Sequence, residues 1–148
     1  MSKSWLYPVL RPEVSSPFGW RMLHGNWQNH TGVDFISKDG NLVIMAVADG
    51  TVIHDQDAYN PQLRWDVTSP YSGGKFVIIK HKYKRATFYV RYLHLEENHV
   101  SLNQTVTAGQ QIGIMGDLGY SFGVHLHLDV FDANWVLQNP EPFFKGER

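Results

Sequence analysis

The sequence predicts an all-β fold, a compact antiparallel sandwich or barrel-sandwich hybrid with loops around a groove. Apolar runs of strand length alternate with turn-forming Gly, Pro, Asn and Asp residues along most of the chain, a pattern typical of sandwiches and barrels. No segment keeps a 3.6-residue helical period over a useful length. Residues 124–130 alternate strictly between apolar and polar side chains, as expected of a strand with one buried face.

Length and composition indicate one globular domain. The chain has 148 residues, of which 43% are hydrophobic and 18% charged, which is enough for a substantial core. We expect a single domain over residues 1–148, with its core at roughly 14–131 and a C-terminal tail that wraps the core.

Composition also excludes several classes of protein and site. The formal net charge of −1 argues against a nucleic-acid binder. No apolar run approaches the length of about 18 residues that spans a membrane, so we expect no membrane insertion. The chain has no cysteine, which excludes disulfides and thiolate metal sites. Any metal must be held by His and carboxylate side chains, a ligand set that suits zinc or another borderline metal.

In the first half of the chain, turn signals separate the expected strands. Residues 11–21 contain two prolines and Gly19 and are expected to form loop and turn. Extended segments are expected at 30–35, 42–48 and 51–53. The dipeptide Asp49-Gly50 predicts a tight hairpin turn between the last two segments.

In the second half, residues 55–74 are polar and rich in turn residues, which predicts a long surface loop. Strands are expected at 75–83 and 86–95, joined by a turn at Lys84-Arg85. A polar turn is expected at 96–98, and a shorter strand at 111–116 between glycine turns.

The alternating late stretch places two histidines on one face. His125, His127 and Asp129 share one parity, and the aliphatic residues around them share the other. If the apolar parity faces the core, the two histidines project together from the opposite face, about 7 Å apart along the strand. One imidazole can then bind a metal while the other reaches a group beside it.

A second pair, His30 and Asp34, requires a bend. Gly32 and its β-branched neighbours favour extended chain over helix. In a straight strand the two Cα atoms would lie about 13 Å apart, too far for shared ligation of one ion. If both residues bind one ion, the segment bends, and Gly32 is where it can do so.

With His94, these residues form the pattern His-x3-Asp, then a lone His two residues after Tyr92, then His-x-His. In its glycine-rich surroundings, this pattern closely resembles the lysostaphin-like zinc endopeptidases of the M23 family, which cut peptide bonds in bacterial peptidoglycan. The resemblance covers roughly residues 14–131. Supporting segments are residues 15–21, 46–52, 106–113 and the stretch around His125.

The resemblance implies one zinc ion per chain, held by His30, Asp34 and His127, with His94 and His125 as catalytic residues. Two neutral imidazoles and one carboxylate leave the site at net +1 with an open position for water. Zinc lowers the pKa of bound water to about 7 and polarises a carbonyl. Because no His-Glu-x-x-His motif supplies a glutamate base, one histidine must take the proton, and the other can stabilise the oxyanion. The assignment between the two is left open.

Three further residues are candidates for substrate binding. Trp27 and Tyr120 would line a peptide groove, although core packing explains such aromatic residues equally well. Arg21 would pair with a substrate carboxylate, or else form a structural salt bridge. Ordinary core or surface positions are expected for the other histidines: His24, His54, His99, and His81, which we expect to make a structural hydrogen bond.

Several positions depart from the usual family pattern, and none of them is a candidate metal ligand. They bear on loop shape and fine substrate fit: Leu118, Phe122, Val124, Leu128 and Asp129.

Three other functions fit these residues less well. A degenerate relative that binds peptidoglycan or activates wall hydrolases would lack ligands, and none is missing. A biotinyl- or lipoyl-type carrier needs a lysine at a hairpin tip, and none lies near Met115-Gly116-Asp117. A cupin needs a Glu shortly after His-x-His and another His later, and no His follows His127.

The start of the sequence as written has no apolar core of signal-peptide length, so we expect no export signal of its own. The resemblance implies action on peptidoglycan peptides at the bacterial cell wall. We expect either a phage-encoded, bacteriolytic endolysin or virion component, with phage virion or lysis proteins as partners, or a trimmed secreted protein. The scissile bond, in a stem peptide or a cross-bridge, is left open.

Overall fold

The structure is a computed structural model that describes residues 4–23, 25–56, 75–116 and 124–148. These residues form twelve strands and one short helix: β1 (Pro12–Ser16), β2 (Gly19–Leu23), β3 (Asn26–His30), β4 (Val33–Ser37), β5 (Val43–Met45), β6 (Gly50–Gln56), β7 (Lys75–Tyr83), β8 (Ala86–Asn98), β9 (Thr105–Val106), β10 (Gln111–Met115), β11 (Leu126–Asp132), β12 (Leu137–Gln138) and α1 (Glu141–Lys145). The all-β prediction is therefore confirmed. Nothing helical in these ranges has the length and apolar character needed to cross a membrane.

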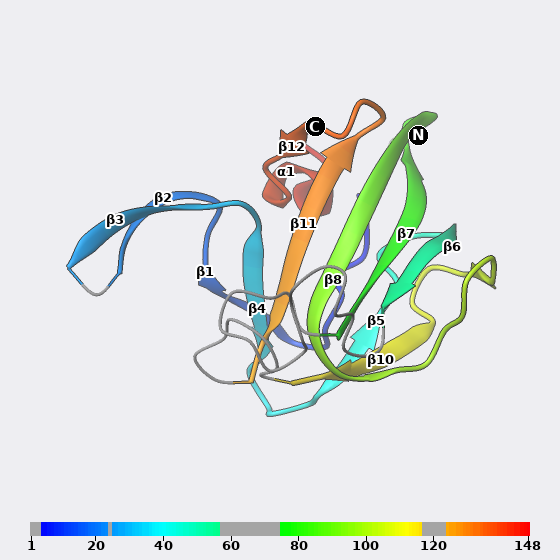
Figure 1. Cartoon of the computed structure of the whole chain (residues 1–148), viewed down its shortest axis with the longest axis horizontal. Coiled ribbons are helices and arrows are strands. Elements are labelled where there is room, and N and C mark those ends of the chain that lie inside the picture. The colour runs from blue at the N-terminus through cyan, green and yellow to red at the C-terminus, as the bar shows by residue number, and fades with distance from the viewer. Residues whose placement is uncertain (1–3, 24, 57–74, 117–123) are drawn as a thin grey trace.

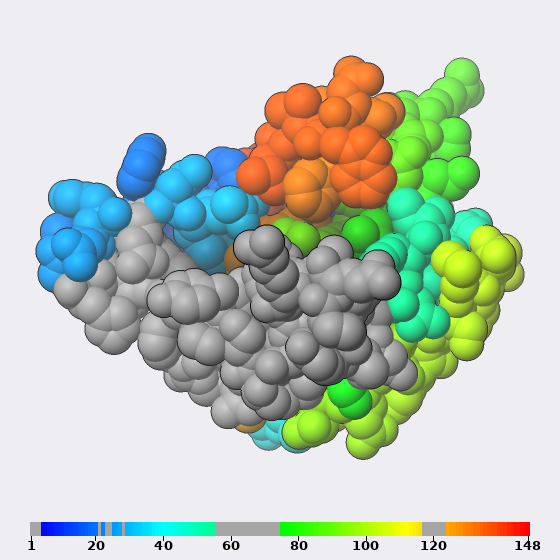
Figure 2. Space-filling view, in the orientation of Figure 1, coloured from blue at the N-terminus to red at the C-terminus, as the bar shows by residue number. Residues whose placement is uncertain are grey.

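One large antiparallel sheet carries most of the strands. Its main path runs β1-β4-β11-β8-β7-β6-β9, with β12 paired to β11, and β10 paired to both β5 and β8. The long strands β8 and β11 lie side by side at its centre (Figure 1). The strands β2 and β3 form a separate hairpin that projects from one end of the molecule, at the left of Figures 1 and 2.

Alternation along β11 separates the core from a polar face. Its aliphatic side chains are fully buried, each with an exposed fraction of 0%: Leu126, Leu128 and Val130. His127, Asp129 and Phe131 project from the opposite face of the sheet. The predicted burial of the apolar parity is confirmed within β11, whereas Val124, which precedes the strand, is 48% exposed. The central sheet keeps one face for chemistry.

Three local predictions are wrong. Residues 11–21 are not simply loop and turn, because β1 pairs with β4 at the sheet edge and β2 pairs with β3. No hairpin forms at Asp49-Gly50, because β5 pairs with β10, whereas β6 pairs with β7 and β9. Residues 96–98 extend β8 instead of turning, because β10 pairs with them. Apart from the local β2–β3 hairpin, each error concerns a partner strand that is distant in the sequence.

The predicted hairpin of β7 and β8 is confirmed. Both residues of its turn have positive φ, 49° at Lys84 and 74° at Arg85, as a two-residue hairpin loop of type I′ requires. The long loop expected at 55–74 lies mostly outside the described residues.

The two ends of the chain meet in an aromatic cluster. Phe143 and Phe144 of α1 are 0% and 5% exposed. Trp5 stacks on Phe143 with ring centroids 4.5 Å apart, and its backbone N–H donates to Phe143 O at 2.9 Å. The C-terminal helix therefore contributes aromatic rings to the core.

His81 is a structural residue, as the sequence predicts. Its Nδ1–H donates to Asp49 O at 3.0 Å, and its Nε2 accepts from the Tyr92 hydroxyl at 2.9 Å. The Tyr92 oxygen in turn accepts from the Val47 N–H at 3.1 Å. Burial lowers the pKa of His81 to about 4, so this imidazole is neutral in the folded protein at neutral pH.

Because this imidazole must stay neutral, mild acid should weaken the fold. The unfolded chain binds a proton near the ordinary pKa of 6.5 and the folded chain only near 4. The contribution of His81 is therefore complete above pH 6.5 and is lost as the pH falls toward 4. Between about pH 7 and 4.5, the free energy of unfolding should fall by about 2–3 kcal/mol more in the native protein than in His81→Gln. Urea unfolding with a chelator present measures the free energy of unfolding of the native protein and of His81→Gln. Equal losses in the two proteins would contradict the neutral state of the buried His81.

Candidate metal centre and active site

Asp34 and His127 meet across two neighbouring strands. The antiparallel register of β4 and β11 places Asp34 directly opposite His127, so that both side chains lie on the same sheet face. His127 Nδ1 lies 2.8 Å from Asp34 Oδ1, and the two side chains are only 12% and 11% exposed. The pair is thus fixed by strand pairing and sheltered from solvent.

His30 joins this pair from the end of β3. Residues 31 and 32 leave the strands between β3 and β4, which confirms the predicted bend at Gly32. His30 Nε2 lies 3.1 Å from His127 Nδ1 and 3.3 Å from Asp34 Oδ1. Gly32 also provides space, because a Cβ there would overlap Leu128 O and lie 2.5 Å from Asp129 Oδ1. The glycine thus allows the bend to pass close to β11.

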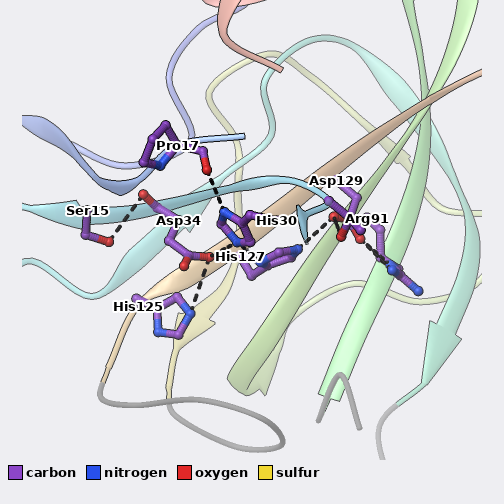
Figure 3. A network of polar contacts seen from close by, with 9 residues as sticks. Ser15, Pro17, His30, Asp34, Arg91, His125, His127 and Asp129 are labelled. Atoms are coloured by element: carbon purple, nitrogen blue, oxygen red, sulfur yellow. Dashed lines mark hydrogen bonds and ion pairs between the residues drawn. The ribbon is translucent and has the colours of Figure 1, made fainter. Parts of the chain in front are cut away.

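Three donor atoms consequently form a small triangle: His30 Nε2, Asp34 Oδ1 and His127 Nδ1 (Figure 3). Their separations of 2.8, 3.1 and 3.3 Å are slightly below the spacing in a tetrahedral zinc site, where bonds of about 2.0–2.2 Å keep ligands about 3.3–3.6 Å apart. A small outward shift of the side chains would open one face of a tetrahedron. The triangle therefore fits a divalent metal ion and leaves a further position open.

The outer hydrogen bonds prepare both imidazoles for ligation. His30 Nδ1–H donates to Pro17 O at 2.8 Å, and His127 Nε2–H donates to Asp129 Oδ1 at 2.7 Å. In each ring, the nitrogen that faces the triangle is the one left to bind a cation through its lone pair. Such outer partners fix the tautomer and orientation of metal-binding histidines.

Asp129 supports His127 from behind. Its carboxylate is fully buried and also accepts from Thr31 Oγ1 at 3.2 Å and from Arg91 Nε at 2.9 Å. Burial raises the pKa of Asp129, but His127 and then Arg91 outweigh burial and hold this pKa well below the usual range. The carboxylate is therefore a charged acceptor whose position is fixed from three sides.

The charges of the triangle itself are strongly coupled. Burial raises the pKa of Asp34, but the hydrogen bonds of His127 and His30 outweigh it and hold this pKa well below the usual range. Burial lowers the pKa of His127, yet the charges and hydrogen bonds of Asp129 and Asp34 raise it to about 9. Without a metal, His127 is therefore protonated at neutral pH. A metal ion must displace the proton on Nδ1 when it binds.

A bulge turns His94 toward the metal face. By alternation along β8, His94 would lie on the side of Val90 and Tyr92, which are both buried in the core. Instead, His94 has a positive φ of 65° where the register of β8 against β7 shifts. Its ring centroid lies 5.1 Å from that of His125 and 5.9 Å from that of His127. Bulges and positive φ at non-glycine residues are typical of functional positions.

His125 is tied to His94 through Gly116. The Gly116 N–H donates to His94 O at 2.8 Å, and the His125 N–H donates to Gly116 O at 3.1 Å. His125 Nε2 lies 3.5 Å from Asp34 Oδ1, beside the donor triangle. A Cβ on Gly116 would lie 2.9 Å from Glu96 N, so only glycine allows this close backbone approach without a shift. The two predicted catalytic histidines are therefore brought together next to the three predicted ligands.

Of the three predicted substrate-binding residues, only Trp27 has a described side chain. Trp27 is 65% exposed and pairs with Met22 in the β2–β3 hairpin, on the face opposite to that of His30. Arg21 belongs to β2, but its side chain lies outside the described part of the structure, as does Tyr120. A role for these residues in substrate binding stays a prediction.

Sequence reasoning missed the supporting pair of Asp129 and Arg91. It gave Asp129 a role only in fine substrate fit, whereas the carboxylate contacts a candidate ligand directly. The available signal was parity, since Asp129 follows His127 by two residues on the same face. Arg91 had no local signal, because only the pairing of β8 with β11 brings it opposite Asp129.

Comparison with known proteins agrees with this geometry. The sequence profile of peptidase family M23 matches residues 28–140. The peptidoglycan DD-endopeptidase ShyC of Vibrio cholerae is 33% identical over 144 residues, which cover 95% of this chain and 29% of that protein. The glycyl-glycine endopeptidase ALE-1 of Staphylococcus capitis is 32% identical over 149 residues, which cover 98% of this chain and 36% of that protein.

A solved structure of a peptidase is also similar to this chain. The catalytic domain of the antimicrobial peptidase lysostaphin from Staphylococcus simulans matches with a TM-score of 0.68 at 28% identity, over 90% of this chain and 92% of that chain. By contrast, this chain spans only about a third of the two curated relatives, 29% and 36% of their lengths.

Gly32→Ala should weaken metal binding. The new methyl group overlaps Leu128 O, so β4 and β11 must separate at the point where Asp34 faces His127. We expect affinity for zinc to fall at least about 10-fold, the scale of losses seen when ligand support is disturbed. Competition with a chelating dye measures this affinity.

Gly40→Ala is the matched control. Gly40 has a positive φ of 76° and no atom within 4 Å of an added Cβ, so the substitution strains the backbone away from the site. It should lower the melting temperature and leave zinc affinity unchanged. Equal affinity in Gly32→Ala and the native protein would contradict the close-approach argument.

Asp129→Asn should reduce zinc affinity about 10- to 100-fold, because it keeps the shape of the acceptor but removes the charge that orients and polarises His127. Dye competition again provides the measurement. Asp39→Asn changes a carboxylate in a turn, where it accepts from Ser37 Oγ at 2.6 Å, and should leave affinity unchanged. The same affinity in all three proteins would remove Asp129 from the support of the site.

Proposed function

Because the chain belongs to peptidase family M23, we propose that it is a zinc-dependent metalloendopeptidase that hydrolyses peptide bonds in bacterial peptidoglycan. The observation that carries the proposal is the donor triangle of His30, Asp34 and His127, with the rings of His94 and His125 beside it. A relative that only binds peptidoglycan or activates other hydrolases has no need of all five side chains. Their joint presence therefore favours the enzyme.

The triangle would hold one zinc ion per chain. Two nitrogen ligands, one oxygen ligand and an open fourth position are typical of catalytic zinc, whereas structural sites are closed by four protein ligands. When bound, zinc supplies a Lewis acid that acidifies a water molecule and polarises the scissile carbonyl.

His94 and His125 would carry the proton chemistry. The carboxylates of Asp34 and Asp129 already bond His127, so we assign the proton transfers to the two imidazoles, which can both accept and donate a proton. One would take the proton of the attacking water, and the other would donate to the carbonyl oxygen as it becomes negative. The backbone bonds through Gly116 hold the two histidine backbones together before substrate arrives, which limits the reorganisation that catalysis needs.

Peptides of the bacterial cell wall are the proposed substrate, and the wall is the proposed place of action. The two relatives named above are, by name, a DD-endopeptidase and a glycyl-glycine endopeptidase, so the scissile bond in a stem peptide or a cross-bridge must come from product analysis. We further propose that residues 1–148 act as one peptidase domain. Bacteriolytic activity as a phage endolysin, with virion or lysis proteins as partners, stays a prediction of the sequence.

Single substitutions should separate zinc binding from catalysis. His127→Ala should lose both zinc and cleavage, because it removes a ligand. His94→Ala and His125→Ala should keep about one zinc per chain and lose cleavage by at least about 100-fold, the scale of general acid–base catalysis. Elemental analysis gives bound zinc, and the release of new amino termini from purified peptidoglycan gives cleavage.

His99→Ala is the matched control, since His99 is a surface histidine that bonds Glu97 at 2.9 Å, and it should change neither quantity. Loss of zinc in His94→Ala or His125→Ala would overturn the division of roles. Zinc without cleavage of Gram-positive or Gram-negative walls would favour a binding or activating relative. A native chain that binds no zinc would refute the proposal.

A further inference from the structure

We propose that Trp135 is a saccharide subsite, which holds a sugar ring of the glycan strand while an attached peptide is cut at the metal centre. The proposal rests on the proposed function and names a further part of its substrate. It is carried by the sheet face that bears His127, by the local structure around Trp135, and by the distance between them.

The metal centre and Trp135 lie on the same continuous sheet face. In β11, His127, Asp129 and Phe131 lie on the same side, and they pair without a register shift with Leu93, Arg91 and Tyr89 of β8. Trp135 follows β11 and stacks on Tyr89 with ring centroids 4.2 Å apart and an interplanar angle of 2°. It also contacts Phe131, with centroids 5.5 Å apart. The metal end and the aromatic end are therefore parts of one surface.

Arg91 forms the floor between the two ends. Its guanidinium bonds Asp129 and lies over the rings of Phe76 and Phe131, 5.7 and 5.6 Å from their centroids. The Arg91 side chain is 32% exposed although its charge is paired with Asp129. A chain that crosses this floor therefore meets guanidinium N–H donors whose position is fixed.

The turn that presents Trp135 is held by hydrogen bonds and has a strained backbone. Trp135 has a positive φ of 63°, which costs energy for a residue with a bulky side chain. Asp132 maintains the turn: its carboxylate accepts from Asn134 N at 2.8 Å and Val136 N at 3.0 Å, and its carbonyl accepts from Trp135 N at 2.9 Å. Despite this support, the indole stays 49% exposed. Strain that keeps a large aromatic side chain at the surface is typical of ligand clamps.

The spacing fits the covalent structure of peptidoglycan, in which short peptides branch from strands of amino sugars. From His127 to Phe131 the sheet spans four residues, about 13 Å, and Trp135 lies one ring contact further, 5.5 Å between centroids. An extended peptide of four or five residues spans about 13–18 Å. A peptide cut at the metal end can therefore reach its sugar at the aromatic end.

A sugar suits this place better than a protein partner does. The exposed apolar surface of the turn consists of the neighbouring side chains of Trp135 and Val136, 49% and 55% exposed, which is far below the roughly 800 Å² per partner of a stable protein interface. A flat indole, backed by Tyr89 and flanked by exposed Asn134, offers a stacking face and an amide to a ring that carries both C–H and hydroxyl groups. In Figure 2, this end of β11 and the turn after it (orange) lie on the surface of the face in view.

The test compares two substrates from the same wall: intact peptidoglycan sacculi, and the cross-linked peptides released from them by an amidase, which carry no glycan. Trp135→Ala should cut sacculi about 3- to 10-fold more slowly, the scale of one aromatic stacking contact, and should cut the free peptides at the native rate. Trp135→Phe, which keeps a ring, should retain most of the activity on sacculi. Leu102→Ala, which shortens another exposed apolar side chain, 56% exposed, should match the native protein on both substrates.

A second measurement is independent of cleavage. Co-sedimentation of the metal-free proteins with intact sacculi should show weaker binding for Trp135→Ala than for Trp135→Phe, and zinc content and melting temperature identify any variant that has lost its fold. Equal loss on both substrates would assign Trp135 to the peptide or to the fold, and no loss on either would leave it without a role; both results overturn the subsite. If the native protein cuts neither substrate, the proposed function fails, and sedimentation alone decides the subsite.

Discussion

The candidate centre depends on one strand register, the pairing of β4 with β11 that sets Asp34 opposite His127. A slip of one residue would turn His127 and Asp129 into the core and expose the aliphatic side chains of β11. The opposite face prevents such a slip, because four of its side chains are fully buried: Val33, Phe35, Leu126 and Leu128. Each contributes about 1.5–3 kcal/mol by burial. Apolar packing, more than the polar contacts, therefore holds the donor atoms at ligating distance.

Local pattern predicts the parts of the site that local geometry determines. Alternation alone places His127 on the face away from the core. Shared ligation of one ion by His30 and Asp34 would require a bend, and the structure has this bend at Gly32. The close approach of Gly32 to Leu128 was not predictable, because it depends on which strand lies beside the bend. The same limit explains the missed strand β1, the false hairpin at Asp49-Gly50 and the missed extension of β8. In each case, the partner is distant in the sequence.

The position of His94 in the structure differs from the one that strand alternation predicts. By alternation it would lie with Val90 and Tyr92 in the core, and only the positive φ at the shift of register brings its ring near His125. Nothing in the residues around it indicates such a bulge, so its expected role came from the resemblance alone. Gly116 completes the arrangement, since it bonds the backbones of both histidines. The positive φ at His94 and the backbone bonds of Gly116 depend on each other. The role of neither residue can therefore be predicted from its own place in the sequence.

The ion pair of Asp129 and Arg91 connects the metal end of the sheet to its aromatic end. An ion pair with one buried partner is weak evidence for stability, because the cost of removing charge from water offsets most of the attraction. Its value here is orientation. With Arg91 balancing its charge, Asp129 accepts the Nε2–H of His127 as a fixed anion, while Asp34 keeps its own carboxylate for the triangle. Arg91 is held in turn by the rings of Phe76 and Phe131. Aromatic packing along the sheet face and the geometry of the metal centre are therefore coupled through one carboxylate, so that a substitution among those rings can change metal affinity without touching a ligand.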